Sequence, residues 1–326
     1  MTDLLRGRLA PSPTGELHLG HARSFLLAWW SSRARGGEVV LRLDDLDGER
    51  CRPEFEEAAR RDLRWLGLDW DGEVVRQSSN RALHLSALER LLEAGLAYPC
   101  TCTRSEIRAR TSTSPVGDAG DRYPGTCRGR YKDVESARTE SGRKVAVRLT
   151  VEAGRVTFVD GLFGEVSEDV SAVVGDFIIG RKDGEAAYQL SVVLDDADQG
   201  VTEVVRGRDL LSSTARQILV HRALGIPAPA WIHVPLVVDG DGARLAKRTG
   251  ALALATLREQ GVQPERIVAW AARTSGISGL GYLPGRATPS EVLDLLPADL
   301  GVSPLAGGPV EPIPMATPED LLRPEV

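Results

Sequence analysis

Apolar and polar residues follow two different periods along the first hundred residues of the chain. Apolar residues recur every three or four positions in residues 53–66 and 80–95, and in a stretch that begins near Leu19, which predicts three helices. A short strand is predicted to end near Ala10, and the largely apolar stretch EVVLRL at residues 38–43 predicts a buried strand. A strand, a helix and a second strand in this order are typical of an open parallel sheet with helices on both faces.

The same two periods predict the elements of the remaining chain. Short apolar runs predict further strands at residues 144–149, 156–160, 176–180, 188–195, 200–205 and 233–238. Helical spacing predicts a helix from about Ser212 and two more at residues 252–260 and 264–274. Nine of the 19 prolines follow Leu283, so we expect an irregular tail.

A bend rich in Pro and Gly joins the first strand to the first helix, in the stretch RLAPSPTGELHLGHAR at residues 8–23. His18, Gly20 and His21 fall at the start of that helix, where unpaired N–H groups and the positive end of the helix dipole favour phosphate oxygens. Gly20 lets a ring or a phosphate approach the backbone. The stretch is therefore a candidate nucleotide site. The alternative is a strand, turn and helix that the histidines merely cap.

Charged residues at two predicted strand ends are candidates for binding a small charged substrate. Asp44 follows the strand at residues 38–43, where ligands bind in doubly wound sheets, and a carboxylate there suits a cationic group. Arg206 ends another strand beside Gly207, where a guanidinium can hold a carboxylate in a fork. The alternatives are a solvated acidic loop and a surface arginine.

Three of the cysteines are spaced as candidate metal ligands. Cys100 and Cys102 form a C-x-C motif that Cys127 can join, and three thiolates suit a tetrahedral zinc with one further ligand. A partly buried, reduced trio is the alternative, and Cys51 lies apart and is expected only to pack. Lys247 lies in the basic segment ARLAKR, which taken alone indicates a surface turn.

Composition narrows the class of protein. The 326 residues are 42% hydrophobic and 26% charged, as in an ordinary globular enzyme, and four cysteines are too few for a disulfide scaffold. A net charge of -6 neither supports nor excludes a nucleic-acid partner, because a local basic face can coexist with it. The start of the chain lacks the pattern of a signal peptide and no 18-residue apolar segment occurs, so we expect a cytoplasmic protein with no membrane contact.

The segments APSPTG and HLGH together resemble the first signature of class I aminoacyl-tRNA synthetases, in the form that glutamyl-tRNA synthetases carry. Members of that family activate an amino acid with ATP, which Mg2+ accompanies, and pass the amino acid to tRNA. The segment ARLAKR stands where the family has its mobile lysine loop, with Arg244 and Ala246 in place of a Lys and a Ser. The resemblance implies a catalytic and ATP-binding set: His18, Gly20, His21 and Lys247.

The resemblance also implies a glutamate site, formed by Arg8, Leu9, Ala10, Pro11, Ser12, Asp44, Tyr188 and Arg206. Tyr188 lies in the run AYQLSVVLDD and Arg206 in VVRGRDL, which both resemble substrate-site runs of the family. Asp44 stands where the family has a Glu that receives the ammonium group of the amino acid. Its side chain is one methylene shorter, so either the strand lies closer to the substrate or a water fills the gap.

The cysteine spacing resembles a subset of this family more closely. Short relatives of glutamyl-tRNA synthetases, which attach glutamate to queuosine in tRNA(Asp), bind zinc through a C-x-C and a Y-x-x-x-C, with the Tyr as fourth ligand. This chain has both halves, CTC and YPGTC. The implied ligands of a structural Zn2+ are Cys100, Cys102, Tyr123 and Cys127.

Pattern and resemblance together predict an α/β fold with a Rossmann-like doubly wound parallel sheet. We expect the catalytic domain to be split between residues 1–97 and 186–250, around an inserted α+β subdomain with the zinc site at residues 98–185. Residues 251–326 are expected to form a short helical region and a Pro-rich tail, too short for an anticodon-binding domain.

The expected function is ATP-dependent activation of L-glutamate without tRNA, followed by transfer to queuosine in the anticodon loop of tRNA(Asp). Three alternatives stay open at this point. A truncated glutamyl-tRNA synthetase would charge tRNA(Glu), and another Rossmann nucleotidyltransferase would activate a different acid. A non-catalytic synthetase-like module would bind tRNA without activating any amino acid.

Overall fold

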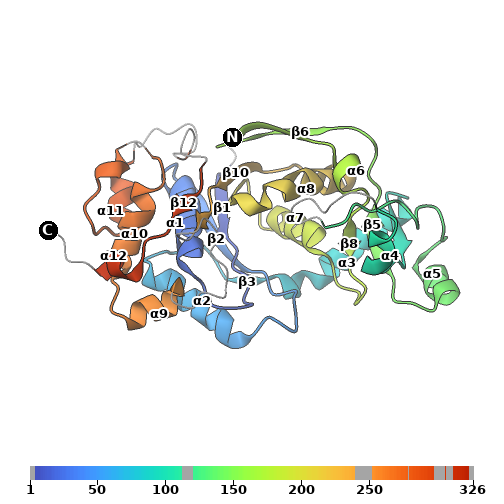
Figure 1. Ribbon diagram of the computed structural model, residues 1–326, viewed down its shortest axis with the longest axis horizontal. Coiled ribbons are helices and arrows are strands. Elements are labelled where there is room, and N and C mark those ends of the chain that lie inside the picture. The colour runs from blue at the N-terminus through green and yellow to red at the C-terminus, as the bar shows by residue number, and fades with distance from the viewer. Residues whose placement is uncertain are drawn as a thin grey trace.

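Parallel strands form the centre of the molecule (Figure 1). The computed structural model describes residues 4–111, 120–238, 252–277, 279–296, 305 and 311–322. The first three strands pair in chain order and run parallel to one another, namely β1 (Arg6–Leu9), β2 (Glu38–Leu43) and β3 (Val75–Arg76). Helix α1 (Leu19–Arg33) connects β1 to β2, so the strand, helix and strand expected at the start of the chain are confirmed.

The other strands of the central sheet come from distant parts of the chain. β10 (Ala230–Val234) lies between β9 (Glu203–Gly207) and β6 (Val156–Asp160) and runs parallel to both. β7 (Gly164–Glu168) closes the edge, antiparallel to β6. The N–H of Thr202 donates to the carbonyl oxygen of Arg6 over 2.9 Å, so β9 begins beside β1 and the two sets of strands adjoin.

Helices cover both faces of these strands (Figure 1). α1 and α10 (Pro264–Arg273) pack on one face, where Trp30 and Leu26 are fully buried. α7 (Tyr188–Asp198) and α8 (Leu211–Leu224) pack on the other, in a second apolar core. This burial on both sides explains why Val39, Val40 and Leu41 of β2 are apolar in succession instead of alternating with polar residues.

Two longer helices follow β2 in the chain. α2 (Pro53–Trp65) starts with a Pro at its first position and α3 (Arg81–Glu93) follows the 3-10 turn η1 (Gln77–Asn80), close to the bounds expected from spacing. The short α6 (Val170–Val173) and the 3-10 turn η3 (Arg208–Leu210) precede β8 and α8 respectively.

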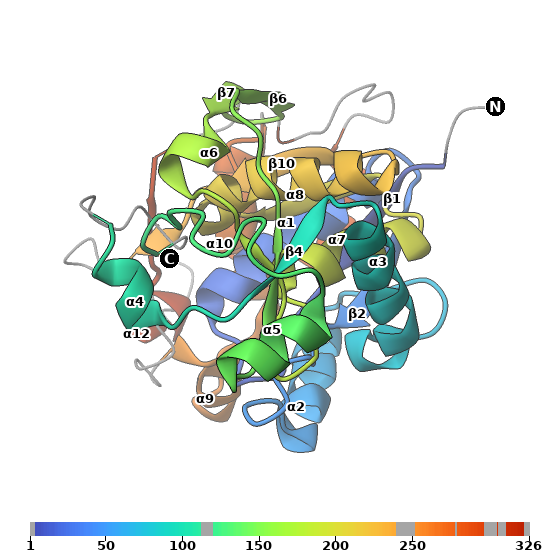
Figure 2. The same cartoon turned by 90° about the vertical axis from the view of Figure 1, so that its right-hand side faces the viewer.

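A small antiparallel sheet lies beyond one end of α3 (Figure 2). It consists of β4 (Ala97–Cys100), β5 (Ala146–Leu149) and β8 (Ile178–Gly180), with helices α4 (Arg104–Arg108) and α5 (Val134–Ser141) beside it. The residues from 98 to 185 do not form one separate body, because β6 pairs with β10 of the central sheet. The local apolar pattern of β6 could not reveal which partner strand it joins.

Residues 188–195 form the first two turns of α7, so the prediction of a strand there is wrong. The run YQLSVVLD is apolar and contains paired β-branched residues, and such a short run does not distinguish a strand from a buried helix. Burial on nearly every side of α7 removes the polar stripe that marks an amphipathic helix.

The C-terminal part is more ordered than its prolines indicate. α9 (Leu254–Glu259) and α10 confirm the two expected helices. The predicted strand at residues 233–238 is interrupted at Pro235, so β10 ends at Val234 and β11 (Val237–Val238) is separate. The 3-10 turn η5 (Leu280–Tyr282) precedes the Pro-rich tail. Within the tail, β12 (Ile313–Pro314) pairs in parallel with β11, and the expectation of an irregular tail is wrong there and at α11 (Pro289–Asp294) and α12 (Pro318–Leu322).

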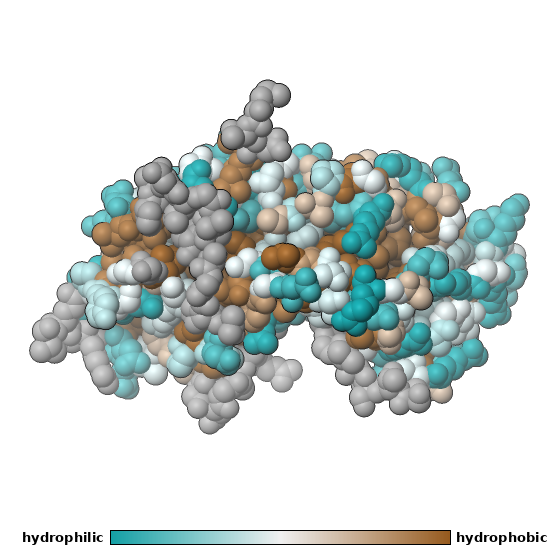
Figure 3. Space-filling model, turned by 90° about the horizontal axis from the view of Figure 1, so that it is seen from above, coloured by the Kyte–Doolittle hydropathy of each residue, from teal (hydrophilic) through white to brown (hydrophobic). Residues whose placement is uncertain are grey.

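The surface carries hydrophilic side chains most densely at the end of the molecule that includes α5 (Figure 3). Apolar residues show mainly over the middle and the opposite end of that face. Within the described part of the chain, no helix has the length and apolar character needed to cross a membrane.

Candidate active site

The bend after β1 and the start of α1 form one wall of the site. His18 is the N-cap of α1, where its Nδ1 accepts from the Gly20 N–H over 3.1 Å. The N–H of His18 donates in turn to Nδ1 of His21 over 3.2 Å, and the two rings stack with centroids 3.7 Å apart. Each imidazole thus satisfies one helix-end N–H group, as in a capping box. The histidines do cap the helix, as one interpretation of the sequence held, and both also line a cavity.

Two arginines come from neighbouring strands at the opposite wall. Arg8 on β1 is buried and its Nη1 donates to the carbonyl oxygen of Val205 over 2.9 Å, while its Nε has no hydrogen-bond partner. Arg206 on β9 is buried as well, which excludes the surface arginine considered from the sequence. Burial lowers the pKa of Arg8 from its ordinary value, because charged groups are less stable away from water. Both side chains line the same cavity and offer donors to an anion.

Acidic side chains at the site are held by Arg42, which is fully buried. Its Nε donates to Asp44 over 2.7 Å and its Nη1 to Asp196 over 2.5 Å. Asp196 also lies 3.7 Å from Nε of Arg8, so this carboxylate serves two guanidinium groups. Burial raises the pKa of Asp44 above its ordinary value even though Arg42 donates to it. Asp44 is therefore part of a buried network of charges and not a solvated acidic loop.

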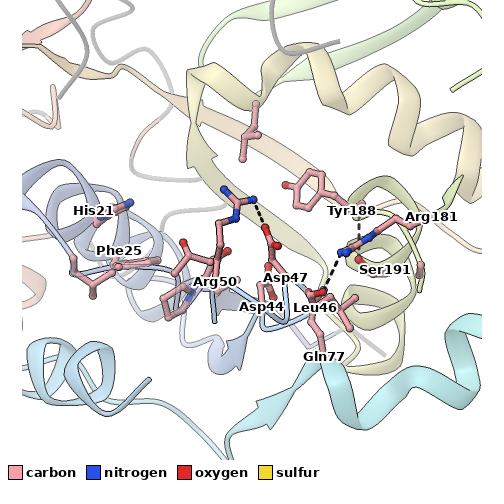
Figure 4. A pocket seen from close by; sticks show the side chains of 18 residues that line it. His21, Phe25, Asp44, Leu46, Asp47, Arg50, Gln77, Arg181, Tyr188 and Ser191 are labelled. Atoms are coloured by element: carbon pink, nitrogen blue, oxygen red, sulfur yellow. Dashed lines mark hydrogen bonds and ion pairs between the residues drawn. The ribbon is translucent and has the colours of Figure 1, made fainter. Parts of the chain in front are cut away.

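Two adjoining cavities occupy the space between these walls. The larger, of about 440 Å3, is lined by Ala10, Pro11, Ser12, His21, Asp44 and Tyr188 among others, and Figure 4 shows Tyr188 opposite His21 and Phe25. The smaller, of about 190 Å3, shares Ala10, His21, Asp44 and Tyr188 and adds Arg8, His18, Gly20 and Arg206. Apart from Leu9, which is fully buried in the core, the implied glutamate residues thus meet around one continuous space. Lys247 lies outside the described residues.

The helical form of α7 explains how it supplies several groups to the site. Tyr188 and Ser191 line the larger cavity and Val192 the smaller one, at the spacing of one helix turn. Asp196 follows one turn after Val192 and reaches Arg8 and Arg42. Sequence reasoning missed Asp196, although the tandem acids at the end of AYQLSVVLDD were a signal for it.

Neighbouring side chains anchor the implied residues from behind. Asp195 accepts from Gln77 over 2.8 Å and lies 2.9 Å from Nε2 of His84, and Gln77 itself lines the larger cavity. His233 and Asp160 extend behind Arg206 in a similar way. Nothing in the local sequence marks these residues, because their partners lie on other strands and helices.

The cysteine cluster lies where β4 ends, away from the two cavities. The sulfur atoms of Cys100, Cys102 and Cys127 all lie within 4.8 Å of one another. The hydroxyl oxygen of Tyr123 accepts from the thiol of Cys100 over 3.4 Å and from the N–H of Cys127 over 2.9 Å. Three thiols and a phenol oxygen therefore converge, which is a donor set that suits zinc. Among the described residues no other group of His, Cys, Asp and Glu forms such a cluster.

Charges near the cluster favour at least one thiolate. Nε of Arg148 donates to the sulfur of Cys100 over 3.3 Å, and its guanidinium lies 3.6 Å above the ring of Tyr123. Burial raises the pKa of Cys127. Hydrogen bonds from Thr101 and Tyr123 outweigh burial and lower this pKa to about 7. Burial and the adjacent Cys100 raise the pKa of Cys102 to about 11. A thiol is a metal ligand as its thiolate, so Cys127 is better prepared for metal binding than Cys102.

A third cavity, of about 800 Å3, lies between this cluster and α7. Six cationic side chains line it, and Asp121 is the one acid among the described residues of the lining: Arg104, Arg108, Arg148, Arg181, Lys182 and Arg216. Arg181 also lines the larger of the two cavities described above, so the two spaces adjoin. Nζ of Lys182 donates to the carbonyl oxygen of Cys102 over 2.9 Å, which ties the cavity wall to the C-x-C segment.

Fold and site together define a class I tRNA synthetase catalytic domain. Residues 4–279 match the family model described as tRNA synthetases class I (E and Q), catalytic domain. The structure is also similar to a glutamate tRNA ligase from Elizabethkingia meningosepticum in complex with its amino acid, with a TM-score of 0.78 and 24% identity over 97% of this chain and 68% of that chain. The glutamate-tRNA synthetase from Elizabethkingia anophelis has the same TM-score and identity over 96% and 68% of the two chains.

Curated relatives narrow the family further. The chain is 46% identical over 283 residues to a glutamyl-Q tRNA(Asp) synthetase of Nitratidesulfovibrio vulgaris, which covers 84% of this chain and 87% of the relative. It is 48% identical over 271 residues to that of Nocardia farcinica (83% and 85% covered), and 45% identical over 293 residues to that of Deinococcus radiodurans (89% and 95% covered). The chain belongs to the glutamyl-Q tRNA(Asp) synthetase family and is thus a ligase.

Proposed function

We propose that this protein activates L-glutamate with ATP and transfers it to queuosine in the anticodon loop of tRNA(Asp). The observation that carries the proposal is the pair of buried arginines, Arg8 and Arg206, which face the same cavity as Asp44 beside the capped start of α1. Such a site offers two cations to carboxylates and one anion to an ammonium group, which is the charge pattern of glutamate. The printed name of the curated relatives supplies the acceptor.

Activation is an attack of the α-carboxylate of glutamate on the α-phosphorus of ATP, with release of pyrophosphate. Arg8 and Arg206 hold carboxylate groups, and Asp44 receives the ammonium. Because Arg42 fixes one oxygen of Asp44, the shorter side chain is held in one orientation. The reaction needs no covalent enzyme intermediate, so these residues act by positioning the substrate and by neutralising charge.

His18, Gly20 and His21 bind the nucleotide at the N-terminus of α1. The positive end of the helix dipole favours phosphate oxygens there, and the two rings are already stacked at the cavity wall. Lys247 meets the departing pyrophosphate. Mg2+ enters with ATP and supplies further neutralisation of phosphate charge.

A structural Zn2+ fits the cysteine cluster. Cys100, Cys102 and Cys127 provide three sulfur ligands and the Tyr123 oxygen the fourth, and four protein ligands leave no open position for a substrate. A metal held by these residues would stabilise the segment that joins β4 to β5 and would take no part in the chemistry.

The cationic cavity supports the RNA partner. Its side chains present positive charge between the cysteine cluster and the glutamate site, and phosphate contacts from Arg and Lys position RNA without reading its sequence. An anticodon loop bound there places a nucleoside near the activated glutamate, because Arg181 lines both spaces. The cis-diol of the queuosine ring resembles that of a terminal ribose, so one active-site geometry serves for either.

Exchange between ATP and radiolabelled pyrophosphate tests the activation step. We expect exchange that depends on glutamate, that glutamine and aspartate do not support, and that proceeds without tRNA. Exchange only in the presence of tRNA would contradict tRNA-independent activation, and exchange with another acid would contradict the substrate. Binding of tRNA without any exchange would show a non-catalytic module instead.

A further inference from the structure

Three side chains form a relay across neighbouring strands behind the glutamate site. Asp160 ends β6, His233 lies on β10 and Arg206 lies on β9, and these strands are adjacent with β10 in the middle. Oδ2 of Asp160 lies 2.6 Å from Nδ1 of His233, and Nε2 of His233 lies 3.0 Å from Nε of Arg206. Both Asp160 and His233 are buried, so water does not compete for these contacts.

The two ends of the relay demand the same tautomer of His233. An ionised carboxylate only accepts, so Nδ1 of His233 carries a proton and donates to Asp160. The guanidinium of Arg206 only donates, so Nε2 must accept from it. A neutral ring with its proton on Nδ1 satisfies both neighbours, and a protonated ring would point an N–H at a cation.

Charged groups around His233 agree with a neutral ring. Burial foremost, and then the cations Arg206 and Arg8, lower its pKa, while Asp160 acts in the opposite direction. The N–H groups of Leu162 and Phe163 also donate to Asp160, over 3.0 Å each. Burial alone raises the pKa of Asp160. The hydrogen bond from His233 and those from these two N–H groups outweigh burial and hold this pKa below its ordinary value.

The relay fixes one edge of the Arg206 guanidinium. Its Nε donates to His233, and its Nη2 donates to the hydroxyl of Thr214 over 2.8 Å and to the carbonyl oxygen of Leu210 over 3.2 Å. Nη1 has no hydrogen-bond partner among the described residues, and Arg206 lines the smaller cavity. Protein groups thus bind Nε and Nη2 of Arg206 and leave Nη1 for a ligand.

We propose that His233, oriented by Asp160, is a positioning residue that holds Arg206 in place for a carboxylate of glutamate. This inference rests on the proposed function, because it takes glutamate as the ligand of Arg206. A fixed guanidinium loses little rotamer freedom when the substrate binds, so the relay contributes to the affinity for glutamate more than to the rate at saturation.

Two substitutions of His233 separate its contact with Asp160 at Nδ1 from its contacts at Nε2, where the hydroxyl of Thr214 lies 3.2 Å away in addition to Arg206. In His233→Gln the amide reaches about as far as Nε2, so its oxygen can still accept from Arg206. In His233→Asn the shorter amide reaches only the place of Nδ1, so it keeps the contact with Asp160 and leaves Nε of Arg206 without an acceptor. The variants are similar in polarity and differ in which partner they retain.

The measurement is the KM for glutamate and the kcat of ATP–pyrophosphate exchange. We expect His233→Asn to raise the KM about ten- to a hundredfold with a smaller change in kcat, the scale of a lost hydrogen bond to a charged group. His233→Gln should restore the KM to within a few-fold of the unmodified protein. Asp62→Asn is the control, because it alters another buried charged contact, with Arg258, at a residue that neither touches Arg206 nor lines either cavity, and it should leave the KM unchanged.

Thr214→Val provides a second probe if His233→Asn does not fold. It removes the hydroxyl that accepts from Nη2 and should raise the KM for glutamate, while Thr214→Ser should not. The relay is refuted if the Gln and Asn variants of His233 have equal KM values, or if the Val and Ser variants of Thr214 do. This conclusion requires that the unmodified protein shows glutamate-dependent exchange. Absence of that exchange in the unmodified protein would overturn the proposed function itself.

Discussion

Asp196 is the residue on which the charge balance of the glutamate site depends most. Its carboxylate lies 2.5 Å from Nη1 of Arg42 and 3.7 Å from Nε of Arg8. All three side chains are at least nine-tenths buried, so solvent screens these contacts little. The substitution Asp196→Asn keeps the shape and removes the charge that the two guanidinium groups share.

The expected cost follows from those distances. At an effective dielectric of about 20, two unit charges about 4 Å apart attract by about 4 kcal/mol. Removing one partner of a buried pair costs about 3–5 kcal/mol, because the other charge stays buried. Arg42 keeps Asp44 and the Asn oxygen still accepts, so we expect a loss near the lower limit, about 3 kcal/mol.

Urea unfolding measures this loss of stability, and glutamate-dependent exchange measures its effect on the site. We expect the KM for glutamate to rise as well, since Asp196 no longer places Arg8. Glu135→Gln is the control, because its ion pair with Arg138 lies exposed on α5 and is worth no more than about 1 kcal/mol. If Asp196→Asn loses no more stability than Glu135→Gln, buried charge does not hold the site together.

Three further predictions concern the lysine loop, the cysteine cluster and the buried histidines. Lys247→Ala should lower the rate of glutamate-dependent exchange about a hundredfold, which is the scale of one lost transition-state donor. The control Lys144→Ala should leave the rate unchanged. An unchanged rate in Lys247→Ala would exclude Lys247 from the mechanism. Elemental analysis should find about one zinc per chain. Cys102→Ser should lower the zinc content and the thermal stability more than the exchange rate, and Cys51→Ser should keep the metal. Fully stable protein without metal would refute the zinc site. The free energy of unfolding should fall as the pH falls below the ordinary histidine pKa of 6.5, because burial lowers the pKa of His221 and His233 and the unfolded chain binds more protons; a flat profile from pH 7 to 5 would contradict this.

The pattern of apolar and turn residues predicts the part of the site whose residues lie close together in the chain. The bend after β1, the start of α1 at Leu19 and the position of Asp44 at the end of β2 all follow from residues close together in the chain. Apolar periodicity and turn residues act over a few positions, so they predict such elements well.

Contacts between distant segments could not be predicted from that pattern. Asp160, Arg206 and His233 meet because β6, β9 and β10 are neighbours, and the order of strands in a sheet is not written in any one strand. The apolar run at residues 188–195 predicts a strand because burial of α7 removes the helical period, and a strand does not predict that Asp196 reaches Arg8. The resemblance implies Tyr188 as a site residue whatever its element type, and Tyr188 lines the larger cavity.

Transfer of labelled glutamate to three acceptors tests the central claim most directly. The acceptors are tRNA(Asp) that contains queuosine, the same tRNA with unmodified guanosine, and tRNA(Glu), each offered with ATP. We predict that only the queuosine-containing tRNA(Asp) becomes labelled, and that the label stays on its anticodon fragment after nuclease cleavage. Labelling of tRNA(Glu) at its 3′ end, or equal labelling of the two forms of tRNA(Asp), would contradict the account.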